Sequence, residues 1–168
     1  MNKITKGIRE YDWIAIIGSR EPTEQQEIEV IKLIEQLDPS TEAVISGCAE
    51  GIDKLALMTA QNLGIKTIGI LPWPKYNMDI QTYCDYKVCL DELNPFTRDM
   101  AYSSVKRLHP AADKLSQGMV KLHARNYGII LFAAKVIAAP SSKPGGGGTG
   151  QGIRIAEELL LPLTIIKA

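Results

Sequence analysis

The most constraining feature of this sequence is a repeated pairing of a short apolar run with an amphipathic segment. "WIAIIGS" (13–19), "EAVISG" (42–47) and "KTIGILP" (66–72) are apolar runs of strand length, and helix-like segments separate them. A chain that alternates strand, helix and strand forms a parallel sheet, with right-handed crossovers that place helices on its faces. We therefore predict an α/β fold with a doubly wound, mostly parallel sheet in three α/β/α layers.

The local signals support this reading. Thr23 and Gln26 have the spacing of a capping box at a helix start. Ile28, Ile31, Ile34 and Leu37 predict an apolar stripe along that helix. The second half of the chain predicts a helix over 112–132, a strand at "KVIAAP" (135–140), a helix over about 150–160 and a strand at "LTIIK" (163–167). Residues 73–111 are less regular and show only a short strand pattern at "KVCLD" (87–91).

Composition limits the size and partners of the protein. The 168 residues suit a single domain over 1–168, and 19 basic and 19 acidic residues give a net charge of zero. The charge balance argues against a protein whose whole surface is basic and binds nucleic acid. The charge is uneven, however, because residues 98–125 carry six bases and two acids. We therefore predict weak, salt-sensitive binding of single-stranded DNA through this segment.

Several features bear on location and on metals. The three cysteines, Cys48, Cys84 and Cys89, have neither zinc spacing nor a CxxC motif, which favours free thiols in a reducing compartment. His109 and His123 lack metal-site spacing, so we predict no metal site. The sequence shows no signal peptide and no membrane-length apolar run. We expect a cytoplasmic protein that forms a homo-oligomer.

Glycine and hydroxyl residues follow the predicted strands. In an open parallel sheet, ligands bind at the carboxyl ends of the strands, where glycine and a helix N-terminus favour a phosphate. Ser19, Ser46 and Thr149 add hydroxyl groups there, and Arg20 adds a charge. Four such segments are "GSR" (18–20), "SGCAEGID" (46–53), "LPWPKYN" (71–77) and "PSSKPGGGGTG" (140–150). We predict that they share one pocket for a nucleotide or a phosphate, and that the glycine run wraps the phosphate.

Four other residues have two interpretations each. Asp53 stands at a helix start, where it either caps the helix or contacts a ligand. Arg125, with Asn126 next to it, either faces the pocket and pairs with an anion or lies on a solvated helix face. Trp73 is either part of the core or a stacking surface for a base.

"IIGSR", "VISGCAEGID", "GIKTIGILP" and "HARN", followed by the glycine-threonine loop, resemble the SLOG superfamily of Rossmann-like nucleotide-binding proteins. The nearest pattern is that of the DNA-processing protein A family, the recombination mediators, and it covers about 13–72 and 120–166. The resemblance implies a Rossmann-like fold and a nucleotide- or nucleic-acid-binding protein, in a family associated with single-stranded DNA and recombinase loading. It implies a pocket at Gly18, Ser19, Arg20, Ser46, Gly47, Gly51, Asp53, Arg125 and Asn126.

A second resemblance is to the LOG-type phosphoribohydrolases, which carry PGGxGTxxE. Pro144 to Thr149 fits PGGxGT and adds Gly146, Gly147, Gly148 and Thr149 to the predicted site, but Gly152 stands at the glutamate position. Two alternatives therefore stay open. One is an enzyme that cleaves an N-glycosidic or phosphate bond of a nucleotide, with Asp53 as the candidate catalytic acid, although we expect little such activity. The other is a binder that senses or sequesters a nucleotide signal.

Overall fold

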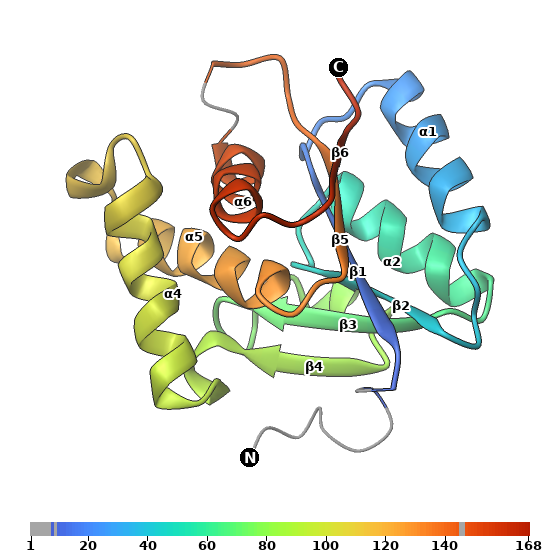
Figure 1. Cartoon of the computed structure of the whole chain (residues 1–168), viewed down its shortest axis with the longest axis horizontal. Helices are drawn as coiled ribbons and strands as arrows, with labels where there is room; N and C mark the ends of the chain where they lie inside the picture. The colour runs from blue at the N-terminus through green and yellow to red at the C-terminus, as the bar shows by residue number, and fades with distance from the viewer. Residues whose placement is uncertain (1–7, 9, 145–146) are drawn as a thin grey trace.

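Six parallel strands form one sheet in the order β4-β3-β2-β1-β5-β6 (Figure 1). The structure is a computed structural model that describes residue 8, residues 10–144 and residues 147–168. Its strands are β1 (Asp12–Gly18), β2 (Glu42–Ser46), β3 (Lys66–Leu71), β4 (Tyr86–Cys89), β5 (Lys135–Ala139) and β6 (Leu163–Ile165). The prediction of a doubly wound parallel sheet is confirmed. The assignment of 1–168 to a single domain stays a prediction.

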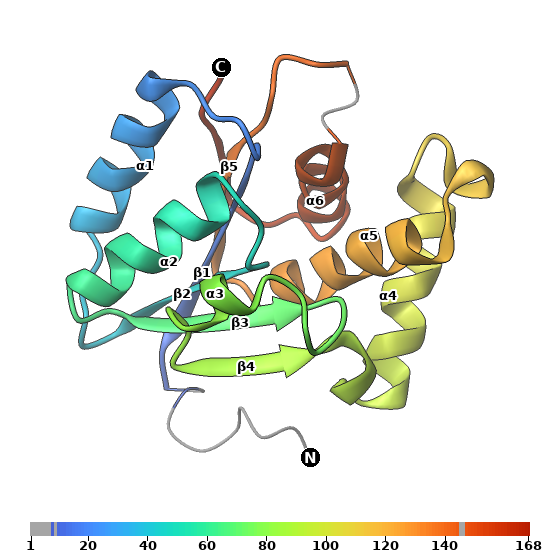
Figure 2. The ribbon, with the colours of Figure 1, turned by 180° about the vertical axis from the view of Figure 1, so that it is seen from behind.

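Helices cover both faces of the sheet and complete the three layers (Figures 1 and 2). They are α1 (Glu24–Glu35), α2 (Ile52–Asn62), α3 (Met78–Gln81), α4 (Pro95–Leu108), α5 (Gln117–Ile130) and α6 (Gly147–Glu158). The first three lie on one side, where α1 and α2 share a core with the central strands. Helices α5 and α6 cover the other face, and α4 packs beside them.

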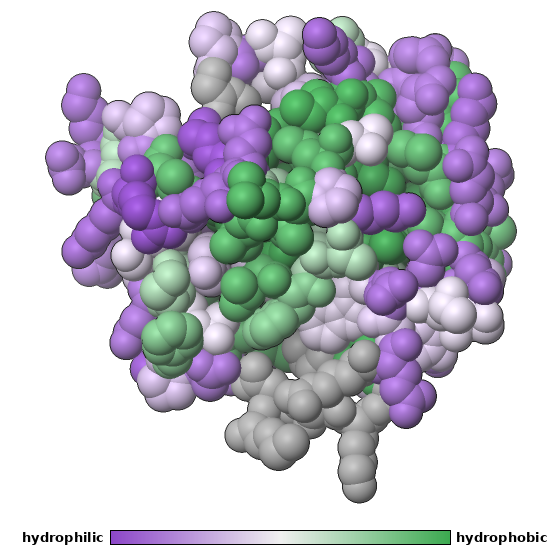
Figure 3. All heavy atoms as spheres, viewed as in Figure 1, coloured by the Kyte–Doolittle hydropathy of each residue, from purple (hydrophilic) through white to green (hydrophobic). Residues whose placement is uncertain are grey.

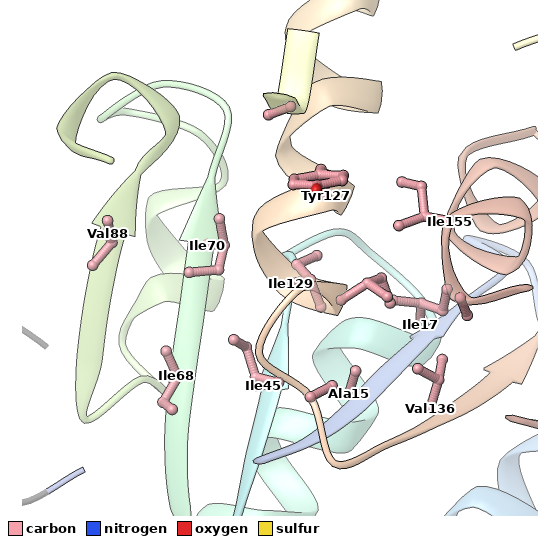
Figure 4. Packing of buried hydrophobic residues seen from close by; sticks show 14 of the residues in the cluster. Ala15, Ile17, Ile45, Ile68, Ile70, Val88, Tyr127, Ile129, Val136 and Ile155 are labelled. Carbon is pink, nitrogen blue, oxygen red and sulfur yellow. The ribbon is translucent and has the colours of Figure 1, made fainter. Parts of the chain in front are cut away.

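Side chains of the central strands alternate between two cores. Ile14 and Ile16 face α1 and α2, whereas Ala15 and Ile17 face α5 and α6. This period of two is the geometry of a strand, and burial on both faces explains why the strands read as unbroken apolar runs. Figure 4 shows Ile17 of β1 between Ile129 of α5 and Ile155 of α6.

Helix α1 begins at the predicted capping box, but the side of the helix that faces the core differs from the predicted apolar stripe. Thr23 and Gln26 form the expected capping box. The predicted stripe is partly wrong, because Ile28 is 40% exposed while Gln26 and Val30 are buried. Gln26 tolerates burial because its Nε2 donates to the carbonyls of Pro140 (2.8 Å) and Ile166 (2.9 Å). The helix is thereby fixed to the ends of β5 and β6.

The region 73–111 holds two α-helices that were not predicted from the sequence, α3 and α4. Asn94 caps α4 by accepting the N–H of Thr97 at 2.8 Å, and Pro95 occupies its first turn. The strand pattern at 87–91 is confirmed as β4. The predicted helix over 112–132 starts later, because the Ser116 hydroxyl caps α5 through the N–H of Met119.

Apolar side chains gather over β6 and the turn between α6 and β6 (Figure 3). Leu160 is 90% exposed and Ile165 is 43% exposed in this area. Assembly into a homo-oligomer stays a prediction. Within the part of the chain that the structure describes, no helix has both the length and the apolar character to cross a membrane.

Candidate functional site

The strand order reverses direction at β1, which lies between β2 and β5. The chain runs outward from β1 through β2, β3 and β4, and then returns to the other side of β1 as β5. The N–H of Ser19 donates to the carbonyl of Ala139 at 2.8 Å and joins the two strand ends. Beyond this bond the chain leaves β1 toward α1 and leaves β5 toward α6. Open α/β sheets bind ligands at such a switch point.

Next to the switch point, Gly47 is held on both sides by side chains. Its N–H donates to Oδ2 of Asp53 at 3.2 Å, and its carbonyl accepts from Nη1 of Arg125. A Cβ at this position would lie 2.6 Å from that Nη1 and 3.0 Å from that Oδ2. Only glycine fits between the two charged groups.

Asp53 and Arg125 are both buried, with 5% of each residue exposed. Burial raises the pKa of Asp53. The Arg125 charge, the Ala49 N–H, the Ser46 hydroxyl and the Gly47 N–H act in the opposite direction. The Arg125 guanidinium is thus close enough to Asp53 to act on its carboxyl group electrostatically. Its guanidinium also lies 5.5 Å from the ring centroid of Tyr76, a stabilising cation–π contact.

Asp53 does not cap its helix in the predicted way. Gly51 is the N-cap of α2 and no side chain forms a capping hydrogen bond there. Asp53 is the second residue of the helix. Its Oδ2 instead accepts the N–H groups of Gly47 and Ala49, both at 3.2 Å. The carboxylate therefore holds the loop that leads into the helix.

Gly51 joins this loop to the one after β1. Its φ is +82°, which favours glycine, and a Cβ would lie 2.3 Å from the Ser19 carbonyl oxygen. That carbonyl accepts the N–H of Ile52 at 3.1 Å. The loops after β1 and β2 thus lie together, as predicted.

The predicted hydroxyl and arginine residues differ in exposure. Ser46 is fully buried and its Oγ donates to the Ile16 carbonyl at 2.6 Å, so this hydroxyl supports the sheet. The Oγ of Ser19 accepts the N–H of Glu21 at 3.0 Å. Gly18 lies beneath the side chain of Ile52. Arg20 is exposed at the same edge.

Asn126 connects this cluster to the glycine loop. Its Oδ1 accepts from Nε of Arg125 at 3.2 Å, and its Nδ2 donates to the carbonyl of Gly148 at 2.9 Å. Gly147 and Gly148 are exposed in the first turn of α6, and Thr149 is buried behind them. Gly146 lies outside the described residues. The predicted wrapping of a phosphate by this loop stays a prediction.

The loop after β3 completes the edge through residues that the sequence analysis quoted but did not single out. Nδ2 of Asn77 donates to the Cys48 carbonyl at 3.0 Å, and Tyr76 lies beneath Arg125. Trp73 meets the Tyr76 ring edge-on, with centroids 5.3 Å apart, and is half-buried. It has a core contact, and its role in base stacking stays a prediction. No spacing rule pointed to Asn77, although its φ of 38° is typical of asparagine in a turn.

The basic segment 98–125 offers fewer free charges than its composition indicates. Arg125 is buried. Nε and Nη2 of Arg107 donate to the two carboxylate oxygens of Glu158, at 2.6 and 2.8 Å. Nζ of Lys121 lies 3.9 Å from Oδ2 of Asp91. Within the described residues, three bases of the segment form no ion pair: Arg98, Lys106 and Lys114.

Comparison with known proteins places the chain in a family. The sequence profile of the DNA recombination-mediator protein A family matches residues 5–93, more than half of the chain. This chain belongs to that family. It is 30% identical over 131 residues to DNA processing protein A (DprA) of Streptococcus pneumoniae. The aligned region covers 73% of this chain and 42% of that protein. The chain therefore spans less than half the length of this relative.

Two solved structures share the fold. One is DNA processing protein A from Helicobacter pylori, which is described with a single-stranded DNA binding mode. Its TM-score is 0.67 and its sequence identity 23%, and the match covers 96% of this chain and 67% of the Helicobacter pylori chain. The other is the molybdenum cofactor carrier protein of Chlamydomonas reinhardtii, with a TM-score of 0.59 and 17% identity, over 94% of this chain and 78% of its own. At these identities the likeness shows the fold alone.

Proposed function

We propose that this chain binds single-stranded DNA and seats a backbone phosphate at the carboxyl edge, between the ends of β1 and β5. The observation that carries the proposal is the start of α6 at this switch point, with Gly147 and Gly148 exposed. The first N–H groups of a helix have no partner within it, and the helix dipole favours an anion there. Arg20, exposed after β1, adds a positive charge at the same edge.

Gly148 supports a phosphate site at the start of α6, because packing within the fold does not explain why this residue is glycine. Among the described residues outside its own helix turn, the nearest group to a Cβ there would be Nδ2 of Asn126, at 3.8 Å. Alanine would fit against that part of the chain. Glycine at an exposed helix start costs backbone entropy, so close approach of a ligand to the backbone is a reason for its presence.

DNA is favoured over a free nucleotide by the surroundings of the edge and by the family. Phe96 is 77% exposed at the start of α4, after β4, and Met78 is 61% exposed at the start of α3, after β3. Exposed apolar and aromatic side chains that follow β3 and β4 offer contacts for unstacked bases of a strand that extends along the sheet edge. Arg98, Lys106 and Lys114 extend the positive charge along α4 and the turn beyond it. The Helicobacter pylori relative, described as binding single-stranded DNA, supports the same ligand.

The test compares Gly148→Ala with Gly118→Ala, using fluorescence anisotropy of a labelled oligothymidylate at low salt. Gly118 is a matched control, because it too lies in the first turn of a helix and a Cβ there would meet nothing within 4 Å. We expect Gly148→Ala to weaken binding by roughly tenfold, the loss of about one good hydrogen bond to a charged group. Gly118→Ala should bind like the wild type.

Thermal unfolding of both variants shows whether the fold is intact. Equal affinity of Gly148→Ala and the wild type would contradict the seat at α6. An absence of oligothymidylate binding, together with binding of a nucleoside monophosphate that Gly148→Ala abolishes, would support a nucleotide binder instead and contradict the DNA proposal.

A further inference from the structure

Two cysteines from distant parts of the sequence meet beside the candidate site. Sγ of Cys48, directly after β2, lies 3.5 Å from Sγ of Cys84, in the turn between α3 and β4. A disulfide needs about 2.05 Å between sulfurs, so the two sulfurs must approach each other by about 1.5 Å for the bond to form. We propose that Cys48 and Cys84 form a redox-active thiol pair, which hydrogen peroxide converts into a disulfide bond.

The space for this pair comes from Gly69 in β3. A Cβ at Gly69 would lie 2.7 Å from Sγ of Cys84 and 2.8 Å from Sγ of Cys48. Both sulfurs therefore occupy the volume that any other residue would fill. The position of Cys48 is fixed further by Nδ2 of Asn77, which donates to its carbonyl at 3.0 Å. Pairing of the thiols is thus built into three neighbouring elements.

The two thiols have the environments of an attacking and a resolving cysteine. Cys84 is half-buried and Cys48 is fully buried, so a small oxidant meets Cys84 first. The hydrogen bond between the two sulfurs, in which either thiol can be the donor, lowers the pKa of Cys84, and Lys87 lowers it further against the effects of desolvation and Asp85. The same hydrogen bond and burial raise the pKa of Cys48. A thiolate with a resolving thiol beside it is the arrangement of redox-sensitive cysteines.

The reaction has two steps. The Cys84 thiolate attacks one oxygen of hydrogen peroxide, the O–O bond breaks, and hydroxide leaves and takes up a proton to become water. Sγ of Cys48 then loses its proton and attacks the sulfur of the Cys84 sulfenic acid. The S–S bond forms, the S–O bond breaks, and a second water leaves. The two thiols are oxidised by two electrons and the peroxide is reduced. A small thiol such as glutathione reverses the reaction by exchange.

Cys89 provides the matched control. It is buried in the same cluster but acts as the N-cap of a short 3-10 turn (Leu90–Glu92), and burial raises its pKa. Serine at this position keeps a capping side chain.

The experiment treats the reduced full chain with hydrogen peroxide in molar excess, then measures free thiols by alkylation and the intact mass. We expect the three thiols of the wild type to fall to one, with a mass lower by two hydrogens and full recovery after reduction. Cys89→Ser should lose both of its remaining thiols in the same way. Cys48→Ser should instead accumulate a sulfenic acid on Cys84 that dimedone traps.

A peptide map of the oxidised wild type decides the outcome without any variant. A crosslink between the peptides that contain Cys48 and Cys84 supports the proposal. Three intact thiols, added oxygen atoms without a crosslink, a bond that includes Cys89, or a disulfide between two chains would each overturn it. None of these measurements depends on DNA binding, so the proposed function and the thiol pair fail separately.

Discussion

Arg125 and Asp53 hold the two backbone polar groups of one residue, Gly47, from helices on opposite faces of the sheet. Arg125 of α5 donates to the Gly47 carbonyl, and Asp53 of α2 accepts the Gly47 N–H at 3.2 Å. Each charge offsets part of the cost of burying the other. The pair thereby fixes the loop that follows β2, and it acts on the candidate site by positioning that loop.

This arrangement predicts that Asp53→Asn destabilises the fold. An amide oxygen is a weaker acceptor than a carboxylate for the N–H groups of Gly47 and Ala49, and it removes the electrostatic effect of Asp53 on buried Arg125. The free energy of unfolding should fall by about 1–3 kcal/mol, in the range for hydrogen bonds to a buried charged group. Urea unfolding at neutral pH measures it. Asp79→Asn, on the exposed surface of α3, is the control and should change stability by less than about 0.5 kcal/mol. Equal midpoints for the two variants would contradict the positioning role.

The sequence predicted the parallel sheet and most of the loops at its edge, because strand runs and glycine-containing strand ends are local signals. It did not predict what those residues contact. Ser46 was expected to face a ligand, yet its hydroxyl bonds to the neighbouring strand, a contact that depends on register. Arg125 was expected to pair with an anion, which stays a prediction; its hydrogen bond to the carbonyl of Gly47, which is 78 positions away in the chain, could not be read from the sequence. Gln26 was predicted as part of the capping box, but its burial was not, because a buried amide becomes favourable only when distant carbonyls accept its N–H groups.

A side chain at Gly152 would have to displace the terminal methyl group of Ile17 in the core. A Cβ there would lie 2.3 Å from Cδ1 of Ile17, because α6 packs directly against β1. We expect Gly152→Ala to lower the free energy of unfolding by about 1–3 kcal/mol, the usual cost of overpacking. Gly118→Ala, at an open helical position, should raise it by about 0.5–1 kcal/mol. Chemical denaturation of both variants gives the comparison, and destabilisation by Gly118→Ala alone would refute this account.

His123 should make stability depend on pH. It is buried, its Nδ1 has no partner in the described part of the chain, and the ring of His109 lies 4.4 Å away between centroids. Burial first, then His109, Arg154 and Arg125, lower the pKa of His123 to about 4. In the unfolded chain its pKa is about 6.5. Between these values the unfolded state binds more protons, so stability is complete above about pH 6.5 and falls as the pH drops toward 4.

The loss between about pH 7.5 and pH 4.5 should be about 2–3 kcal/mol, since each pKa unit corresponds to about 1.4 kcal/mol and about two units lie between the unfolded pKa and pH 4.5. Urea unfolding at about pH 7.5 and pH 4.5 measures the difference. His123→Gln should show a smaller difference between the two pH values than the wild type. An unchanged difference would assign the pH dependence to other groups.

Salt dependence should reveal how many bases of segment 98–125 contact DNA. Each phosphate contact on a single strand contributes about −0.7 to the slope of log affinity against log salt. Six contacts would give about −4, but the three bases without an ion pair give about −2. Lys114→Gln should reduce the magnitude of the slope by about 0.7. Lys32→Gln, on α1 across the sheet, should leave it unchanged. A slope of about −3 would mean that the Arg107–Glu158 pair opens on binding.

The final prediction concerns the enzyme alternative suggested by the glycine loop. Cleavage of an N-glycosidic bond develops positive charge on the sugar carbon, which a nearby carboxylate stabilises. The motif position that carries glutamate in the LOG-type enzymes is Gly152, and Ile17 occupies the space where its side chain would begin. Asp53 is the other candidate acid, and its Oδ2 already accepts two backbone N–H groups. We therefore expect no base release above background when the protein is incubated with nucleoside monophosphates and analysed by chromatography. Turnover that persists in Asp53→Asn would show that another group supplies the charge and that the loop serves catalysis after all.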